Sequence, residues 1–517
     1  MNASLGRFSL WLALLYAAWA ILRLLLTPAL EFDEAEQMLH QQWLRTSYGP
    51  QPPLFEWLVW LLRALLAMPA LTAVVVLKAV ALWGIGMAAA LFMLHIGASN
   101  LAARAASMWV LSLPILLWDA PRTLTHSLLA AACVAALVAS SAPLLLRPER
   151  PLPLWRWMLL GGLASAALLS KYNAALALAG WSSVLLAAWW RVTGDFRGWA
   201  RLFVFHMRQA VPMWLPAMGL LAWHASEVWE IWPVVREPIV AKMLPPGDDT
   251  VIQGLMAWAA SWLATLSVPG LLLGLAWWRS RGHLAKAISG HDGRPQTVWL
   301  TLAAVYIAVV GGTMLALVAA GKLAEIKERW ILPLAVPMLL VLAPWWAGRG
   351  DAIARRLHAM AWVLVITALV LLLLRAHLLA WMGRPSWSQL PARAIAQWVD
   401  AQLPADTPTL IVAEPIQLAG AVAAYGKQRH PVLYRHSSAV LWSQQPACSI
   451  AVLLEGESPA GWDRLAQLGF ARQGEVRSIT LPRQPAVGDG VRLQLWLWRH
   501  PGRICPSHAS VYDSLPP

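Results

Sequence analysis

Residues 8–30 are FSLWLALLYAAWAILRLLLTPAL, and residues 31–36 follow directly as EFDEAE. The first stretch is almost wholly apolar and long enough to cross a hydrocarbon core of about 30 Å as one helix. The second stretch puts four carboxylates at the mouth of that helix. Because carboxylates are costly in lipid, they should lie in water or take part in a functional site. Residues 8–30 are too long for the apolar part of a signal peptide and should persist as a helix, with Arg23 snorkelling toward the outer interface.

The composition predicts a membrane protein with many spans. Of the 517 residues, 59% are hydrophobic and 13% are charged. Soluble domains carry about 25% charged residues, so a soluble globular protein is excluded. The net charge of +14 is assigned to cytoplasmic loops, where Lys and Arg set membrane topology, and not to nucleic-acid binding.

Eleven apolar stretches are predicted to span the membrane: 8–30, 71–95, 105–118, 126–146, 155–170, 173–190, 209–225, 252–278, 297–320, 331–346 and 359–381. The stretch 53–68 is short and carries Glu56 and Arg63. If it crossed, the excess of Lys and Arg would fall outside the cell, against the positive-inside rule. It is therefore predicted to be an amphipathic helix in the outer interface. The N-terminus is then cytoplasmic and the chain after residue 381 is periplasmic.

Two domains are predicted: a transmembrane domain over 1–381, with a first outer loop at 31–70, and a small extracytoplasmic α/β domain over 382–517. In the second domain, strands are expected at 410–413, 451–454 and 491–498, and helices at 391–402 and 461–468. Cys448 and Cys505 lie there, and an extracytoplasmic location would let them form a disulfide. Sequence gives no geometry, so the pairing stays open. Cys133 lies in an apolar stretch and is expected to be inert.

Ionisable residues gather at the outer ends of the predicted spans. The cations there include Arg122, Lys171, Arg236, Lys327 and Arg329, and the histidines are His126 and His224. Arg and Lys stabilise the charge of a phosphate leaving group, while a carboxylate can accept a proton from an attacking hydroxyl. The combination predicts group transfer from a membrane-anchored lipid phosphate to an acceptor at the membrane surface.

Three motifs carry a family resemblance: Phe32-Asp33-Glu34-Ala35 after the first span, YGPQPPL at 48–54, and KERWILP at 327–333. In this order they resemble the membrane glycosyltransferases of the GT-C superfamily, within it glycosyltransferase family 39, the protein mannosyltransferase and aminoarabinose transferase group. The resemblance covers the whole chain. It implies a polytopic α-helical fold of GT-C type with about eleven transmembrane helices, outer interfacial helices and a small C-terminal α/β domain.

The resemblance also implies a reaction. The donor would be a polyprenyl-phosphate-linked sugar, and the acceptor lipid A or another envelope glycolipid, on the periplasmic face of the bacterial inner membrane. Asp33 would be the catalytic carboxylate and Glu34 its partner, with Glu31 and Glu36 as solvated neighbours. Arg329 would bind the donor phosphate, and the further candidates are Lys171, Lys327, Arg122, His126, His224 and Arg236. No nucleic-acid partner is expected.

The chain departs from the aminoarabinose transferases at two places. They carry a phosphate-binding lysine where this chain has Gln51, and an arginine near the position of Gln37. These departures indicate a different donor, in the manner of the galacturonic acid transferases that decorate lipopolysaccharide. No cofactor is assigned. Glu36 and His40 have a spacing that suits a metal, but a surface pair is the favoured interpretation, and a divalent ion bridging carboxylates and phosphate is left open.

Two other classes of function remain. A transporter or flippase for a lipid-linked sugar should show ionisable residues at mid-membrane and an inverted repeat, and the sequence shows neither. A non-catalytic envelope assembly protein would depend on residues 382–517 and tolerate the loss of Asp33 and Arg329.

Overall fold

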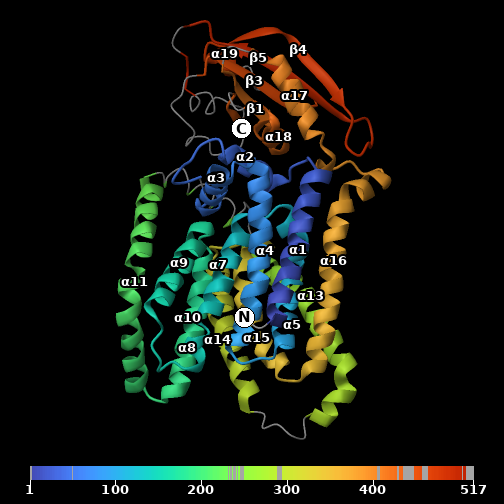
Figure 1. The fold of residues 1–517 in the computed structure, drawn as a ribbon. Helices are drawn as coiled ribbons and strands as arrows, with labels where there is room; N and C mark the ends of the chain where they lie inside the picture. Colours follow the sequence, from blue (N-terminus) through green and yellow to red (C-terminus); the bar gives the residue numbers. More distant parts are fainter. Residues whose placement is uncertain are drawn as a thin grey trace. The chain divides into compact units, whose positions relative to one another are not determined.

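The computed structural model describes residues 3–48, 51–230, 232, 236, 240, 243–244, 250–287, 294–404, 408–427, 430–434, 447–456, 464–502 and 505–507 (Figure 1). The chain divides into two compact units. Unit 1 comprises Met1–Ala18, Pro50–Phe55 and Lys78–Leu369. Unit 2 comprises Trp19–Gly49, Glu56–Leu77 and Val370–Pro517, so it unites the C-terminal region with most of the first predicted outer loop.

The described residues up to 381 are mostly helical. Its helices are α1 (Ala3–Leu26), α2 (Phe32–His40), α3 (Leu54–Leu66), α4 (Ala70–His95), α5 (Asn100–Leu111), α6 (Ala120–Arg122), α7 (His126–Ser141), α8 (Pro143–Leu146), α9 (Leu154–Ser170), α10 (Ala174–Thr193), α11 (Phe196–Glu230), α13 (Thr250–Ala287), α14 (Arg294–Ala319), α15 (Glu328–Ala347) and α16 (Asp351–Trp381). Within the described residues, eight helices are long and apolar enough to cross a membrane, or nine if one bent pair counts as a span. The predicted polytopic helical fold is confirmed. The remaining predicted spans correspond to α9, which has 17 residues, and to α11, which contains Pro212 and Pro216.

The predicted straight span at 105–118 is bent. The helix α5 ends at Leu111, and the segment Ile115–Arg122 continues at 74° to it. The cause is local: the hydroxyl of Ser112 donates to the carbonyl of Trp109 at 2.6 Å, and Pro114 has no N–H with which to continue the helix. The bend positions the short turn that carries Asp119 and Arg122.

The helix predicted over 53–68 is present as α3, with 13 residues. Its exposed face is apolar, since Leu61, Leu65 and Leu66 are 48%, 71% and 60% exposed, while Glu56 is completely buried. An exposed apolar face on a short helix suits the membrane interface, and this location stays a prediction.

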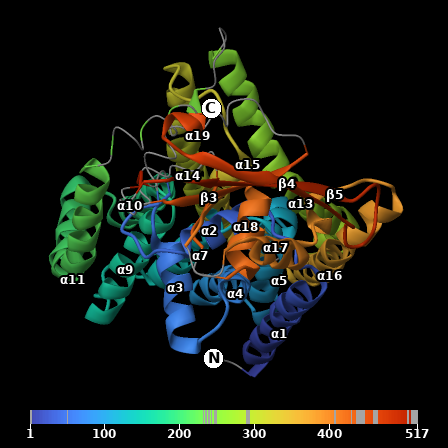
Figure 2. The ribbon, with the colours of Figure 1, turned by 90° about the horizontal axis from the view of Figure 1, so that it is seen from above.

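The C-terminal region contains a five-stranded sheet in the order β2-β1-β3-β5-β4. Its strands are β1 (Leu410–Glu414), β2 (Val432–Tyr434), β3 (Ser449–Glu455), β4 (Ala471–Leu481) and β5 (Val491–Arg499). β1 pairs in parallel with β2 and with β3. β5 pairs antiparallel with β3 and with β4. The helix α18 (Ile416–Tyr425) packs against β1 and β2, and α17 (Ala392–Gln402) packs against α18, on one side of the sheet (Figures 1 and 2).

The predicted strands correspond to β1, β3 and β5, and the predicted helices to α17 and to α19 (Arg464–Gln467). Two strands were not predicted. β4 is exposed along most of its length and so lacks the alternation of apolar and polar residues that marks a strand. β2 has only three residues.

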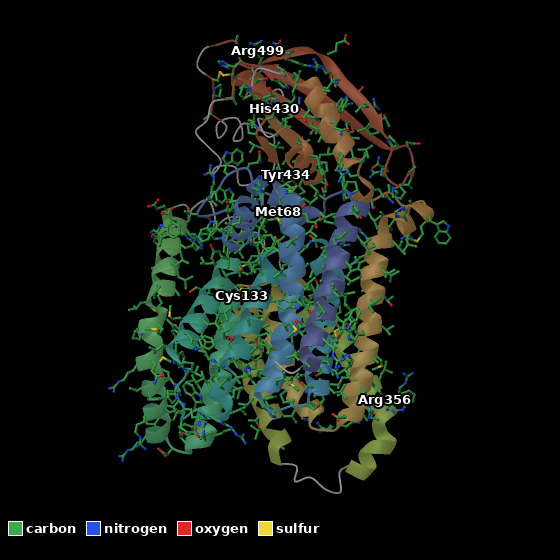
Figure 3. All side chains as sticks on the ribbon, viewed as in Figure 1. Met68, Cys133, Arg356, His430, Tyr434 and Arg499 are labelled. Carbon is green, nitrogen blue, oxygen red and sulfur yellow. A yellow bond between two sulfur atoms is a disulfide. The ribbon has the colours of Figure 1, made fainter. Side chains whose placement is uncertain are left out.

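Cys448 and Cys505 form a disulfide, with their Cα atoms 5.1 Å apart. It lies beside the end of β5, where Arg499 pairs with Ser449 in the sheet register (Figure 3). Ala447 N also donates to the carbonyl of Pro506 at 2.8 Å. The disulfide thus secures the segment after β5 to the start of β3.

A glycine allows α2 to pack directly on α18 within unit 2. A Cβ placed on Gly420 would lie 2.4 Å from the Cβ of Ala35, closer than real Cβ atoms approach one another. The hydroxyl of Tyr425, at the end of α18, donates to the carbonyl of Pro28 at 2.9 Å. These contacts attach the segment from residue 28 through α2 to the C-terminal domain, and α2 carries the predicted catalytic carboxylates.

Candidate active site

The first turn of α2 carries Asp33 and Glu34. Glu34 is completely buried, and its Oε2 accepts hydrogen bonds from Nη2 of Arg23 at 2.7 Å and from the backbone N–H of Glu31 at 3.3 Å. The second bond belongs to a capping box, which satisfies N–H groups that a helix start leaves without partners. Asp33 is only half-buried. Glu34 is therefore a buried structural carboxylate, and Asp33 is the more accessible of the two.

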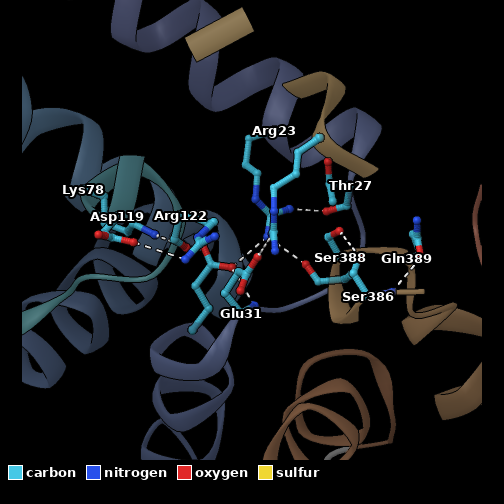
Figure 4. A network of polar contacts seen from close by, with 12 residues as sticks. Arg23, Thr27, Glu31, Lys78, Asp119, Arg122, Ser386, Ser388 and Gln389 are labelled. Atoms are coloured by element: carbon cyan, nitrogen blue, oxygen red, sulfur yellow. Dashed lines mark hydrogen bonds and ion pairs between the residues drawn. The ribbon is translucent and has the colours of Figure 1, made fainter. Parts of the chain in front are cut away.

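Arg23 does not snorkel, contrary to the prediction. It is 8% exposed and lies at the end of α1, where its guanidinium donates to the carbonyls of Thr27 and Ala29 as well as to Glu34 (Figure 4). A buried cation needs partners of this kind, since an unpaired one would carry a large desolvation penalty. Arg23 connects α1 to α2.

Glu31 is also paired, and the prediction of a merely solvated neighbour is wrong. Its Oε1 accepts from Nη1 of Arg375 on α16, and the two side chains are 18% and 22% exposed. Figure 4 shows Glu31 among these polar contacts. The start of α2 is thus connected to α16 as well as to α1.

The far end of α2 holds a second carboxylate group. Glu56 of α3 is completely buried, and its Oε1 lies 3.0 Å from Nδ1 of His40 and accepts from Nε2 of Gln37 at 3.0 Å. Burial lowers the pKa of His40, but the hydrogen bond that its ring donates to Glu56 and the charges of Glu36 and Glu56 outweigh it, so the pKa is raised. The predicted surface pair of Glu36 with His40 is therefore wrong, because His40 is 7% exposed and bonds to Glu56. In the described part of the chain, no group of three or more His, Cys, Asp or Glu side chains is placed to hold a metal.

In unit 1, the turn between α9 and α10 contacts two other segments through its side chains. Nζ of Lys171 donates to Oε1 of Gln51 at 3.2 Å. The hydroxyl of Tyr172 lies 3.0 Å from Nε2 of His224, and the two rings are stacked. The predicted candidates Lys171 and His224 are thus brought to the same turn, although 53 positions separate them in the sequence.

The next residue of this turn reaches the start of α15. Nδ2 of Asn173 donates to the carbonyl of Trp330 at 2.7 Å, next to Arg329, which is half-buried. Lys327 precedes the helix, and its Nζ lies 3.0 Å from Glu325 Oε1, with both side chains about one-third exposed. A pair so exposed is worth little, because water screens it. The contact of Asn173 therefore brings the turn that carries Lys171 next to the start of α15, which carries Arg329.

The bent segment carries another cationic group of unit 1 (Figure 4). Arg122 pairs with Asp119 at 3.1 Å and lies over the ring of Trp118, 5.9 Å from its centre. Nζ of Lys78 donates to the carbonyl of Arg122 at 2.9 Å, and Lys78 is completely buried. Lys78 was not among the predicted site residues. Its signal is plain in retrospect, because it is the one lysine in the apolar stretch 71–95.

The remaining candidates are His126 and Arg236. His126 is buried at the start of α7, and its ring centre is 5.7 Å from that of Phe55. Phe55 and Gln51 belong to one segment of unit 1, so this segment contacts both His126 and Lys171. Arg236 is exposed. The segment 51–55 thereby joins candidates from separate helices.

Carboxylates and cations are divided between the units. Unit 2 contains Asp33 and Glu34, and unit 1 contains the cationic candidates Arg122, Lys171, Arg236, Lys327 and Arg329. A half-buried carboxylate can accept a proton or orient a hydroxyl, and a group of Arg and Lys side chains can bind phosphate. Both halves of the predicted chemistry are present in the chain.

Comparison with known proteins shows which fold this is. No family model matches the chain. The lipopolysaccharide core galacturonosyltransferase RgtA of Rhizobium johnstonii is 26% identical over 508 residues, which cover 92% of this chain and 93% of RgtA. RgtB of the same organism is 26% identical over 353 residues, covering 66% of this chain and 65% of RgtB.

Two solved structures of ArnT from Cupriavidus metallidurans match along almost the whole chain. One is bound to undecaprenyl phosphate and the other is in the apo state, with TM-scores of 0.53 and 0.54. Both are 15% identical in sequence and cover 96% of this chain and 98% of ArnT. The predicted resemblance is confirmed at the level of the fold: the chain is a multi-pass membrane protein with an ArnT-like fold of GT-C type.

Proposed function

We propose that this protein is a glycosyltransferase that moves a sugar from a polyprenyl-phosphate donor to lipid A or another envelope glycolipid. The reaction would take place on the periplasmic face of the bacterial inner membrane. The observation that carries the proposal is the likeness to a lipopolysaccharide core galacturonosyltransferase over 92% of the chain. One of the two ArnT structures is bound to undecaprenyl phosphate, which supports a polyprenyl-phosphate donor.

Asp33 is the proposed catalytic carboxylate. It lies half-buried on the first turn of α2, next to Glu34, whose burial and ion pair with Arg23 suit a positioning residue. In the proposed reaction an acceptor hydroxyl attacks the anomeric carbon of the sugar while the bond from that carbon to the phosphate oxygen breaks. Asp33 takes the hydroxyl proton, and a single displacement inverts the anomeric configuration.

Lys171, Arg329 and Arg122 are the proposed ligands for the departing lipid phosphate. Their charge would stabilise the leaving group more as the bond breaks than in the ground state. The contact of Lys171 with Gln51 supports a specific replacement, since Lys171 would supply the positive charge that the aminoarabinose transferases have at position 51. Lys327 is a weaker candidate because it pairs with Glu325.

The proposed donor sugar is galacturonic acid. The names of RgtA and RgtB support this choice, and so do the departures from the aminoarabinose transferases at Gln37 and Gln51. A flippase or an assembly protein remains the alternative, and neither needs Asp33 as an acid–base group.

Mass spectrometry of envelope glycolipids from cells with and without this protein tests the proposal. The expected result is the loss of one hexuronate residue from lipopolysaccharide or lipid A when the gene is absent, and its return when the gene is restored. Identical glycolipids in the two strains would contradict the proposal. Accumulation of the intact donor on the cytoplasmic side would instead support a flippase.

A further inference from the structure

A polar cavity lies in unit 2, at the opposite end of α2 from Asp33. Its volume is about 670 Å³, and its polar lining residues are Gln41, Gln42, Arg63, Lys427 and His430. Three segments form its walls: the end of α2, the end of α3 with the following turn, and the end of α18 through Lys427 together with His430 and Pro431. Met68 and His430 line it from two of these walls and are labelled in Figure 3.

The walls are fixed by hydrogen bonds. The side chain of Gln42 pairs with β2 as a strand would, donating to the carbonyl of Val432 at 2.9 Å and accepting from its N–H at 2.8 Å. Nη1 of Arg63 donates to the carbonyl of Gln41 at 3.0 Å, and Nδ1 of His430 accepts from the N–H of Thr409 at 3.1 Å. A cavity with such walls is formed before a ligand binds, which reduces the entropy cost of binding.

The lining combines two cations with two indole rings. Arg63 is half-buried and Lys427 is exposed, so both can bind a carboxylate or phosphate with charge-assisted hydrogen bonds. Trp43 and Trp60 supply broad apolar faces with a polar edge. Rings of this type suit the apolar face of a sugar, while the cations suit an acidic substituent on it.

The side-chain amide of Gln41 has an oxygen that could accept a hydrogen bond from a ligand. Gln41 lines the cavity and is 6% exposed, and its Oε1 has no hydrogen-bond partner among the residues that the structure describes. Its Nε2 donates to the carbonyl of Glu56 at 3.1 Å. A buried oxygen without a partner costs free energy, and because Oε1 has almost no accessible surface, a ligand hydroxyl would bond to it only after the Gln41 side chain turns toward the cavity. Hydroxyls, an acidic group and an apolar ring face together describe an acidic saccharide.

The position of the cavity indicates which part of a substrate it holds. From Asp33 to Gln41 the helix α2 rises about 12 Å, so the cavity is remote from the reacting hydroxyl. The exposed apolar residues Leu61, Leu65 and Leu66 of α3 continue from the wall formed by Arg63. A saccharide head in the cavity would therefore leave its lipid chains beside an apolar surface.

We propose that this cavity binds an acidic sugar of the membrane glycolipid that accepts the transferred residue. The inference rests on the proposed function and deepens it, because it names the acceptor as an already acidic glycolipid. The site binds the acceptor at a distance from the reacting hydroxyl and orients that hydroxyl toward Asp33. Binding energy of this remote kind positions the reacting groups.

Saturation-transfer NMR on the full-length protein in nanodiscs tests binding directly, with trigalacturonate as the probe and maltotriose as its neutral counterpart. The test variant is Lys427→Gln, since Lys427 is exposed and its loss should not affect folding. The matched control is Arg472→Gln, an exposed cation of β4 outside the cavity. The expected result is stronger binding of trigalacturonate than of maltotriose, weakened about tenfold by Lys427→Gln and unchanged by Arg472→Gln.

Equal binding by the wild type and Lys427→Gln would overturn the inference. So would equally effective displacement of the probe by inorganic phosphate, which would mean a general anion site. In the transfer assay, Lys427→Gln and Trp60→Ala should raise KM for the glycolipid about tenfold and leave kcat unchanged. Transfer by these two variants with an unchanged KM would refute the role of the cavity in acceptor binding and leave the proposed function intact. Probe binding by a wild type that transfers no sugar would refute the proposed function instead.

Discussion

Nη2 of Arg23 lies 2.7 Å from Oε2 of Glu34, and both side chains are almost completely buried. The pair joins the end of α1 to the first turn of α2, where Asp33 lies. The single variants Arg23→Gln and Glu34→Gln leave one buried charge without its partner. Each should lower the free energy of unfolding by about 3–5 kcal/mol, which thermal unfolding in detergent would detect.

The control for this pair is Glu36→Gln, on the same helix, which should change the melting temperature little. The double variant Arg23→Gln/Glu34→Gln should lose less stability than the sum of its single variants, because neither charge remains buried alone. Additive losses would contradict the assigned ion pair.

The stability of unit 2 should depend on pH through His40. Its folded pKa is raised by Glu56 and Glu36 against the effect of burial. A raised folded pKa means that the stabilisation is fully present below the unfolded value of about 6.5 and is lost as the pH rises through the folded pKa. The melting temperature should therefore fall with increasing pH above about 6.5. This fall of the melting temperature with pH should be absent in His40→Gln. A similar fall in that variant would assign the effect to another group.

The close packing of α2 on α18 predicts a size limit at position 420. In Gly420→Ala the new Cβ would lie 2.4 Å from that of Ala35, so the helices must separate. The expected loss is about 1–3 kcal/mol of stability, with reduced transfer because Asp33 moves with α2. The new Cβ would also lie 2.6 Å from the Cα of Ala35, so the double variant Gly420→Ala/Ala35→Gly should recover neither stability nor transfer. Gly162→Ala is the matched control, since a Cβ at that position meets no atom within 4 Å.

Lys171 should act on the donor and not on the fold. Removing a charged hydrogen bond to phosphate costs about 1.5–3 kcal/mol, so Lys171→Ala should reduce kcat/KM for the donor about 10- to 100-fold. Lys322→Ala, which removes an exposed lysine of unit 1, is the control and should retain the wild-type rate. An unchanged rate for Lys171→Ala would remove Lys171 from the phosphate site.

Long apolar stretches and strands with regular burial were predictable from the sequence. Within the described residues, eight of the eleven predicted spans are helices long and apolar enough to cross a membrane, and α17, β1, β3 and β5 were also found, because their residue patterns directly reflect burial in lipid or in a protein core. The bend after Leu111 was not predicted, since Ser112 and Pro114 lie in an otherwise apolar stretch that masks their effect. The exposed strand β4 had no pattern to detect.

The sequence predicted which residues could belong to the candidate site. It predicted much less well which partners those residues pair with. Asp33, Lys171 and Arg329 followed from motifs near the ends of spans. The partners of Glu31 and Glu34 did not, because Arg375 is 344 positions from Glu31 and Arg23 lies within an apolar helix. Only tertiary structure brings such residues together, and the burial of Glu56 was not predicted for the same reason. Lys78 did carry a signal, as the one lysine of the apolar stretch 71–95.

Transfer by Asp33→Asn is the most direct measurement of the central claim. Membranes containing wild type, Asp33→Asn or the control Glu36→Gln would be given the polyprenyl-phosphate donor and the glycolipid acceptor, and the product measured by mass spectrometry. Asp33→Asn should reach the same expression level and melting temperature as the wild type and lose at least about 100-fold in rate, within the range typical of a removed general base. Glu36→Gln should remain active. Wild-type transfer by Asp33→Asn would contradict the account.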